Sequence, residues 1–230
     1  MKTIGLLGGM SWESTGHYYK LLNEGVKAAR GGLHSAPIAM ISVDFDPLAR
    51  WMQEDDWDAV SRQLCRAAKQ VEAAGADFLM LGTNTMHKVA DDIAAAIDIP
   101  LLHLIDVTAE AIKAQGLTSV GLLGTRTTMT DPFYANRLAA HGLSVVVPTP
   151  AAQDRLNRII FEELCLGNFT DPSRRELLYM MAELKQAGAE GIVEGCTEIG
   201  MLVEPSHTRL PLFDTTRIHA QAAVRLALGD

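Results

Sequence analysis

An internal duplication constrains the fold of this chain more than any other feature of its sequence. The segment 75–86 aligns without a gap on the segment 188–199, at an offset of 188 − 75 = 113 residues. In this alignment Gly82 falls on Gly195, and the next position is Thr83 in the first copy and Cys196 in the second. A period this long does not fit a solenoid of short repeats. The sequence therefore predicts two similar halves.

Two further landmarks repeat in the same order along the chain. The segment 119–125 matches 3–9 at an offset of 119 − 3 = 116, and Pro211 echoes Pro100 at an offset of 211 − 100 = 111. The first domain is therefore expected to comprise residues 1–115 with about 210–230, and the second 116–209. No Pro/Ser-rich linker separates the halves, so we expect them to pack tightly.

Short apolar runs closed by glycine or proline alternate with segments of helical spacing, a pattern typical of βαβ units and parallel sheets. The fold class expected is α/β, with two pseudo-symmetric halves that are each a parallel sheet flanked by helices. The strands expected outside the 188–199 segment are Thr3–Gly9, Ile38–Val43, Phe78–Leu81, Pro100–Leu104, Ser119–Thr125 and Leu143–Val147.

Composition excludes several classes of partner. The chain has 230 residues, of which 48% are hydrophobic, and 28 acidic residues outnumber 20 basic ones to give a net charge of −8. An acidic chain without a basic run argues against nucleic acid or an anionic membrane surface as partner. No apolar stretch approaches the ~20 residues that span a bilayer, and no signal peptide is expected. The three cysteines form no CxxC pair, which favours a reducing, cytoplasmic location.

The loops that follow the duplicated strands are the candidate site. Ligands of parallel α/β sheets bind outside the carboxyl ends of the strands. Thr83 and Cys196 both follow a strand end. If the halves face each other around a pseudo-two-fold axis, the two loops converge on one cleft, which is where we expect the active site.

Cys196 differs from the other two cysteines. Most free cysteines act as small buried hydrophobic residues, and Cys65 and Cys165 fit that interpretation because both are expected within helices at apolar spacing. Cys196 instead follows a glycine at an expected helix start, where backbone N–H groups can lower a thiol pKa from about 8.5. We therefore predict a chemical role for Cys196.

Short polar side chains surround both loops. Asn84, Thr85, Thr125 and Thr197 lie beside glycines. Each alone is the kind of residue that caps a helix, but together they form a set of donors suited to a carboxylate. Met10 and Ser11 follow Gly8-Gly9, where they could simply pack the loop under the sheet.

Motifs for common cofactors do not occur. The glycine-rich segments are not G-x-G-x-x-G, and neither a Walker lysine motif nor a G-x-S-x-G elbow is found. The histidines show no paired ligand spacing, so no metal is expected. A pyridoxal-binding lysine has no fixed motif, but nothing in the sequence favours one, and we expect no cofactor.

Four motifs in order resemble the aspartate/glutamate racemase family of cofactor-independent amino-acid racemases. They are Gly8–Thr15, Thr83–Lys88, Gly195–Glu198 and Phe213–Thr216 followed by Ile218-His219. The resemblance implies two pseudo-symmetric α/β domains, no cofactor, an amino-acid substrate and a homodimer. It also implies one acid/base residue on each face of the substrate α-carbon, with Cys196 on one of them. It assigns carboxylate binding to Asn84, Thr85, Thr125 and Thr197, and places Met10 and Ser11 in the cleft lining.

The chain departs from the family pattern at Thr83, where a second cysteine is expected. A hydroxyl is too weak an acid to supply a resting base, so the resemblance implies slow or asymmetric racemisation. On that face the proton would come through the hydroxyl, a water, His87 or His103. Arg50, expected in a loop after the second strand, is either a surface residue or a contact for the distal carboxylate of aspartate or glutamate.

Two other functions are also consistent with the sequence. A decarboxylase of the same superfamily needs only one cysteine, at the position of Cys196, to protonate an enediolate. A non-catalytic amino-acid binding protein needs none, and Cys196 would then be a ligand contact.

Overall fold

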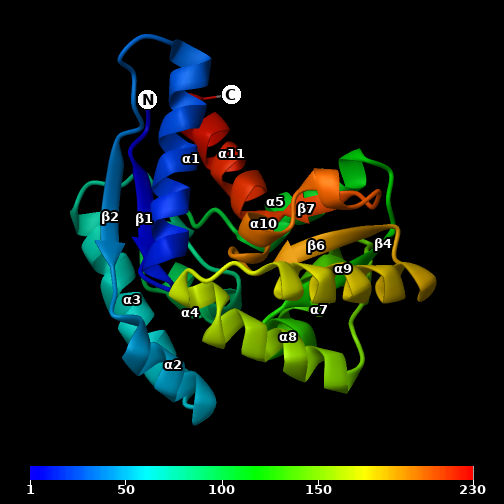
Figure 1. The fold of residues 1–230 in the computed structure, drawn as a ribbon. Helices are drawn as coiled ribbons and strands as arrows, with labels where there is room; N and C mark the ends of the chain where they lie inside the picture. The colour runs from blue at the N-terminus through cyan, green and yellow to red at the C-terminus, as the bar shows by residue number, and fades with distance from the viewer. Residues whose placement is uncertain (230) are drawn as a thin grey trace. The chain divides into compact units, whose positions relative to one another are not determined.

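The computed structural model of the protein describes residues 1–229, which form two α/β units (Figure 1). Unit 1 comprises Met1–Leu104 and the C-terminal segment that starts at His219, and unit 2 comprises Ile105–Ile218. The α/β class with parallel sheets flanked by helices is confirmed in both units. Among the described residues, no helix is both long enough and apolar enough to cross a bilayer.

The sheet of unit 1 has three parallel strands in the order β2-β1-β3. These are β1 (Ile4–Gly8), β2 (Ile38–Ser42) and β3 (Phe78–Leu81). Its helices are α1 (Trp12–Arg30), α2 (Phe45–Gln53), α3 (Trp57–Ala73), the 3-10 helix η1 (Thr85–Val89), α4 (Ala90–Ala95) and α11 (Thr215–Leu228), which enters unit 1 at His219.

Successive side chains of β1 point to opposite faces of this sheet and contribute apolar contacts to both. Ile4 and Leu6 pack into a cluster with α1 and α11, whereas Leu7 packs into a cluster with α3. Figure 1 shows α11 beside α1, and the amide of Lys2 donates to the carbonyl of Ala227 at 2.9 Å. Because strand side chains alternate between faces, these apolar positions bury both faces of the sheet and produce the layered core of unit 1.

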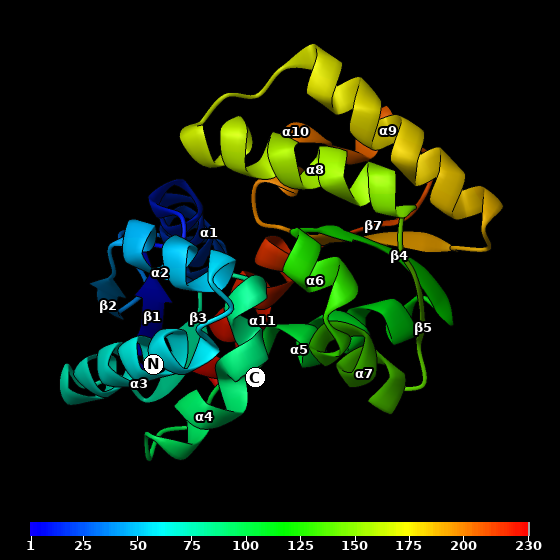
Figure 2. The ribbon, with the colours of Figure 1, turned by 90° about the horizontal axis from the view of Figure 1, so that it is seen from below.

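The sheet of unit 2 has four parallel strands in the order β5-β4-β6-β7. These are β4 (Ser119–Gly124), β5 (Ser144–Val146), β6 (Gly191–Gly195) and β7 (Leu212–Asp214). Its helices are α5 (Leu104–Ala114), α6 (Arg126–Thr130), α7 (Pro132–Ala140), α8 (Pro150–Glu162), η2 (Leu164–Leu166), α9 (Asp171–Gln186), α10 (Ile199–Leu202) and η3 (Pro205–His207). Figure 2 shows α8 and α9 on one face of the sheet and α5 and α7 on the other.

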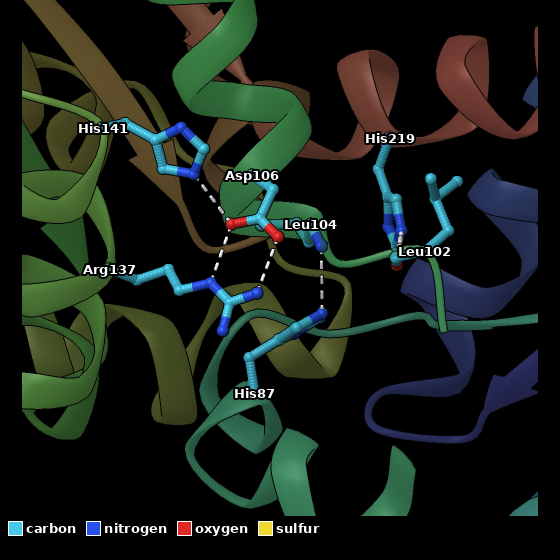
Figure 3. A network of polar contacts seen from close by, with 7 residues as sticks. All are labelled: His87, Leu102, Leu104, Asp106, Arg137, His141 and His219. Carbon is cyan, nitrogen blue, oxygen red and sulfur yellow. Dashed lines mark hydrogen bonds and ion pairs between the residues drawn. The ribbon is translucent and has the colours of Figure 1, made fainter. Parts of the chain in front are cut away.

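A charged cluster joins α5 to α7 on the second of these faces (Figure 3). The carboxylate of Asp106, in the first turn of α5, accepts hydrogen bonds from Arg137 Nε and Nη2, both at 2.7 Å. His141 Nε2 lies 2.9 Å from the same carboxylate. The bidentate geometry holds the two helices in one relative position within unit 2.

The registers of the two sheets follow the offsets of the duplication. Ile4 pairs with Phe78 in unit 1. Adding 116 and 113 to these numbers gives Val120 and Gly191, which pair in unit 2. The repeated sequence therefore encodes one strand arrangement twice.

Three expectations require correction. The strand expected at 100–104 is a single bridge from Leu101 to Leu79, because the chain enters α5 at Leu104. The loop expected after β2 is the helix α2, since Asp44 caps its N-terminus. The segment near 210 lies in unit 2, because β7 pairs with β6. The chain accordingly passes between the units at 104/105 and 218/219, not near 115 and 210.

Candidate functional site

In unit 1, the loops after β1 and β3 lie side by side because these strands are parallel neighbours. The hydroxyl of Ser14 donates to the carbonyl of Gly82 at 3.2 Å, which joins the start of α1 to the loop that carries Thr83. Five of the predicted site residues are buried in these two loops: Met10, Ser11, Thr83, Asn84 and Thr85.

The loop after β1 requires glycine at one position. Gly9 has φ +92°, and a Cβ atom there would lie 2.1 Å from the carbonyl oxygen of Val43. Ser11 then caps α1, because its hydroxyl oxygen accepts from the amide of Ser14 at 3.2 Å. Ser11 therefore acts as a helix cap, and the cap leaves its hydroxyl in this buried loop.

Arg50 lies on α2, and its side chain is exposed. Its Nε atom is 3.2 Å from Asp46 Oδ2, four residues earlier on the same helix. This is the geometry of an ordinary surface ion pair, which contributes little to stability. Binding of a distal carboxylate by Arg50 stays a prediction that nothing in this geometry supports.

In unit 2, the loops after β4 and β6 are neighbours in the same way. A Cβ atom on Gly124 would lie 2.7 Å from the carbonyl oxygen of Gly195, so the two strand ends approach closely only because glycine occupies the position. Thr125 follows β4 and caps α6, its hydroxyl oxygen accepting from the amide of Thr128 at 3.2 Å. Cys196 follows β6 and is 7% exposed.

The carboxyl group of Glu198 is the polar centre of this loop. Its Oε2 accepts from the Cys196 thiol, with Sγ at 3.1 Å, and from the Thr197 hydroxyl at 2.5 Å. Its Oε1 lies 3.9 Å from Cys165 Sγ. Glu198 itself is 2% exposed. Thus a buried carboxyl group accepts a hydrogen bond from the Cys196 thiol.

This contact reverses one expectation. Burial raises the pKa of the Cys196 thiol well above its ordinary value, and the negative charge of Glu198 and the nearby Cys165 add to the increase. The helix start expected to lower that pKa is α10, which is only four residues long and contributes little dipole. The resting group is a thiol, and the carboxylate beside it is positioned to take its proton.

Glu198 is not among the site residues predicted from the sequence. The available signal was its place two residues after Cys196 in the same strand-end loop. Cys165 lies in η2 rather than mid-helix, and it reaches Glu198 across 33 residues of chain. No local pattern indicates that contact.

Comparison with known proteins gives a consistent result. The sequence model of the Asp/Glu/Hydantoin racemase family matches residues 7–223. The chain is 22% identical over 227 residues to the broad specificity amino-acid racemase RacX of Bacillus subtilis (strain 168), covering 98% of each chain.

Two solved structures are similar over their whole length. A candidate Asp/Glu racemase from Yersinia pestis is 49% identical, with a TM-score of 0.91 over 99% of this chain and 100% of that one. An aspartate racemase homologue from Pyrococcus horikoshii OT3 is 34% identical, with a TM-score of 0.84 over the same shares.

Proposed function

Because the chain belongs to the Asp/Glu/hydantoin racemase family, we propose that it is a cofactor-independent racemase acting on aspartate, glutamate or a related amino acid. The observation that carries this proposal is the Cys196 thiol held against the Glu198 carboxyl group at the end of β6. Inverting a stereocentre by proton transfer requires an acid/base group on each face of the α-carbon. Cys196 serves one face, and the loop that carries Thr83 serves the other.

The Cys196 face works by a proton relay. The thiol proton passes to Glu198, the thiolate removes the α-proton, and the electron pair of the broken C–H bond delocalises into the substrate carboxylate. In the reverse step the thiol returns a proton to the α-carbon. The pairing with Glu198 allows a thiol of raised pKa to act as either acid or base, because its proton has a defined destination.

The Thr83 face lacks such a pair. Its hydroxyl, or a water that the hydroxyl orients, delivers a proton to the carbanion but is a poor base. We therefore propose asymmetric turnover, in which the enantiomer deprotonated by Cys196 reacts faster. Asn84, Thr85, Thr125 and Thr197 are proposed to hold the substrate carboxylate as charge builds on it.

Exchange in heavy water tests the proposal. Each enantiomer of aspartate and glutamate is incubated with the protein in D2O, and loss of the α-proton is followed by NMR, with chiral analysis of the product. We expect exchange and inversion of at least one amino acid by the wild type, none by Cys196→Ala, and more symmetric turnover by Thr83→Cys. Full activity of Cys196→Ala would overturn the mechanism.

One observation favours a second function. Only one of the two duplicated positions carries a thiol, which is enough for a decarboxylase that protonates an enediolate from one side. Release of carbon dioxide from an aryl-substituted malonate would support that function. Binding of an amino acid without exchange of either enantiomer would instead leave a binding protein.

A further inference from the structure

His87 connects the Thr83 loop to the start of a helix. Its Nδ1 lies 2.9 Å from the carbonyl oxygen of Thr83. Its Nε2 accepts from the amide of Leu104 at 3.2 Å, the contact drawn in Figure 3. Leu104 is the first residue of α5, where helical N–H groups lack partners within the helix. The ring is 4% exposed. One buried side chain thus spans two backbone segments that are 21 residues apart.

The two contacts determine the tautomer of the ring. An amide nitrogen can only donate, so Nε2 must carry a lone pair, and the ring proton lies on Nδ1. Nδ1–H then donates to the Thr83 carbonyl. An imidazolium would direct a second N–H at the amide of Leu104 and place positive charge at a helix N-terminus, and both effects disfavour it.

The surroundings of the ring are also buried. His103 lies with its ring centroid 4.6 Å from that of His87, and His219 lies at 6.1 Å. The His219 Nε2 donates to the Leu102 carbonyl at 2.9 Å, which leaves Nδ1 to accept from Tyr18 at 3.2 Å. Burial lowers the pKa of His219 to about 3. His87 therefore sits among packed rings that limit its movement.

We propose that His87 is a positioning residue, which orients Thr83 by holding its carbonyl group to the first amide of α5. This inference rests on the proposed racemase function, because it assigns Thr83 to one face of the reaction. A loop that has lost this contact can rotate at Thr83, and small misplacements of a reacting group cost large factors in rate. The Cys196 loop makes no use of the contact, so the two faces should respond differently.

Two substitutions separate the two contacts. In His87→Gln, the amide oxygen can reach the position of Nε2 and accept from Leu104, but the donor to Thr83 is lost. In His87→Asn, the amide NH2 can take the position of Nδ1 and donate to Thr83, but Leu104 loses its acceptor. The quantity measured is a ratio of two products formed in D2O. It compares α-deuterated amino acid of inverted configuration with α-deuterated amino acid of retained configuration. Retention requires only Cys196, whereas inversion requires both faces.

We expect His87→Gln to lower this ratio about tenfold or more and His87→Asn to lower it less. Tyr18→Phe is the matched control, since it removes a hydrogen bond of the same buried cluster without touching Thr83. It should leave the ratio unchanged within about twofold. An equal fall of the ratio in Tyr18→Phe, or a wild-type ratio in His87→Gln, would overturn the positioning role.

A second measurement keeps this inference separable from the proposed function. Long-range 1H–15N NMR of the imidazole reports the tautomer without any substrate. A neutral ring protonated on Nδ1 in the wild type supports the contact, and a ring protonated on Nε2 or on both nitrogens at neutral pH overturns it. If the wild type neither exchanges nor inverts any substrate, the racemase proposal fails, and this spectrum alone decides whether His87 holds the loop.

Discussion

The carboxyl group of Glu198 governs what the thiol of Cys196 can do. It lies 3.1 Å from the sulfur in a buried loop, and its charge helps to raise the pKa of the thiol. A thiolate formed there without proton transfer to Glu198 would place two negative charges side by side. Removal of this charge should therefore make the Cys196 thiol more reactive toward alkylation but slow catalysis.

The substitution Glu198→Gln tests this opposition. It removes the anion, so the pKa of Cys196 should fall and alkylation of Cys196 at pH 8 should become faster. Proton exchange should nevertheless slow by about 10²- to 10⁴-fold, because the acceptor of the thiol proton is lost. Mass spectrometry after iodoacetamide treatment locates the modified cysteine, and D2O exchange gives the catalytic rate.

Cys165→Ala provides the control, since it removes the second thiol near Glu198 but leaves the carboxyl group in place. Its exchange rate should stay close to that of the wild type. Unchanged alkylation together with full exchange in Glu198→Gln would show that the carboxyl group plays no part in the chemistry of Cys196.

The ends of the two duplicated strands differ in how much room they leave for a side chain. Gly195, the last residue of β6, has no such room, whereas Gly82, directly after β3, has. A Cβ atom on Gly195 would lie 2.8 Å from Leu122 Cδ1 and 2.9 Å from the carbonyl oxygen of Leu123. On Gly82, the equivalent position, the nearest atom would be Leu6 Cδ1 at 3.4 Å, an ordinary contact.

We therefore expect Gly195→Ala to destabilise the protein by about 1–3 kcal/mol through overpacking. Gly82→Ala should change stability by less than about 1 kcal/mol. Urea denaturation followed by circular dichroism measures both. Equal losses in the two variants would mean that the close contact at Gly195 relaxes without cost.

The strand β6 also holds a carboxyl group in an unusual state. Glu194 is 2% exposed, faces Asp214 across the β6–β7 register, and its Oε1 has no hydrogen-bond partner among the described residues. Burial and the charge of Asp214 raise its pKa from 4.5 to about 8, while Arg217 opposes the increase. The folded protein therefore holds a proton on Glu194 that the unfolded chain releases near pH 4.5.

Stability should accordingly fall as the pH rises from about 4.5 to about 8. Below this range Glu194 is protonated in both the folded and the unfolded protein, so its ionisation does not affect stability. Above this range the ionised, buried carboxylate lowers the free energy of unfolding by the full amount, about 5 kcal/mol. Glu194→Gln keeps the volume without the charge, so its free energy of unfolding should exceed that of the wild type at pH 8 and vary less across the range.

Urea titrations at several pH values measure this difference. Glu190→Gln offers a control of opposite sign, because hydrogen bonds from the amides of Thr118 and Ser119 lower the pKa of Glu190. Glu190→Gln should therefore lower the free energy of unfolding at neutral pH and leave it unchanged in acid. A Glu194→Gln profile parallel to that of the wild type would contradict the buried, protonated state of Glu194.

In the molecule as a whole, one unit is formed by a single continuous segment of the chain and the other by two separate segments. Unit 2 is one continuous segment, 105–218, whereas unit 1 requires the C-terminal residues from His219 onward. In unit 1, Ala220, Ala223 and Val224 of α11 pack against the α1 side of the sheet. A fragment that ends at Leu104 would leave that apolar face uncovered.

We therefore expect the fragment 105–218 to fold alone and the fragment 1–104 to remain unfolded or aggregate. Circular dichroism, NMR dispersion and a cooperative urea transition test both fragments. A third fragment, 1–104 joined to 215–230 by a flexible linker, should recover folding of unit 1. Absence of a cooperative transition in 105–218 would show that this unit depends on the rest of the chain.

The duplication, the parallel α/β class and the two loops that follow β3 and β6 can all be predicted from the amino-acid sequence. These features are local: apolar periodicity sets the strands, and glycines mark where they end. The offsets between the repeats also relate the two strand registers, because the pairing of Ile4 with Phe78 seen in unit 1 then predicts the pairing of Val120 with Gly191 in unit 2.

Which side chains contact one another depends instead on the folded arrangement of the elements. The thiol of Cys165 reaches Glu198, and His87 joins Thr83 to Leu104, through contacts that depend on how separate elements pack. The raised pKa of Cys196 follows in the same way, because burial and a neighbouring carboxylate outweigh the short helix α10. A local pattern specifies strands and loops, but the electrostatic environment of a buried group is set by residues distant in the chain.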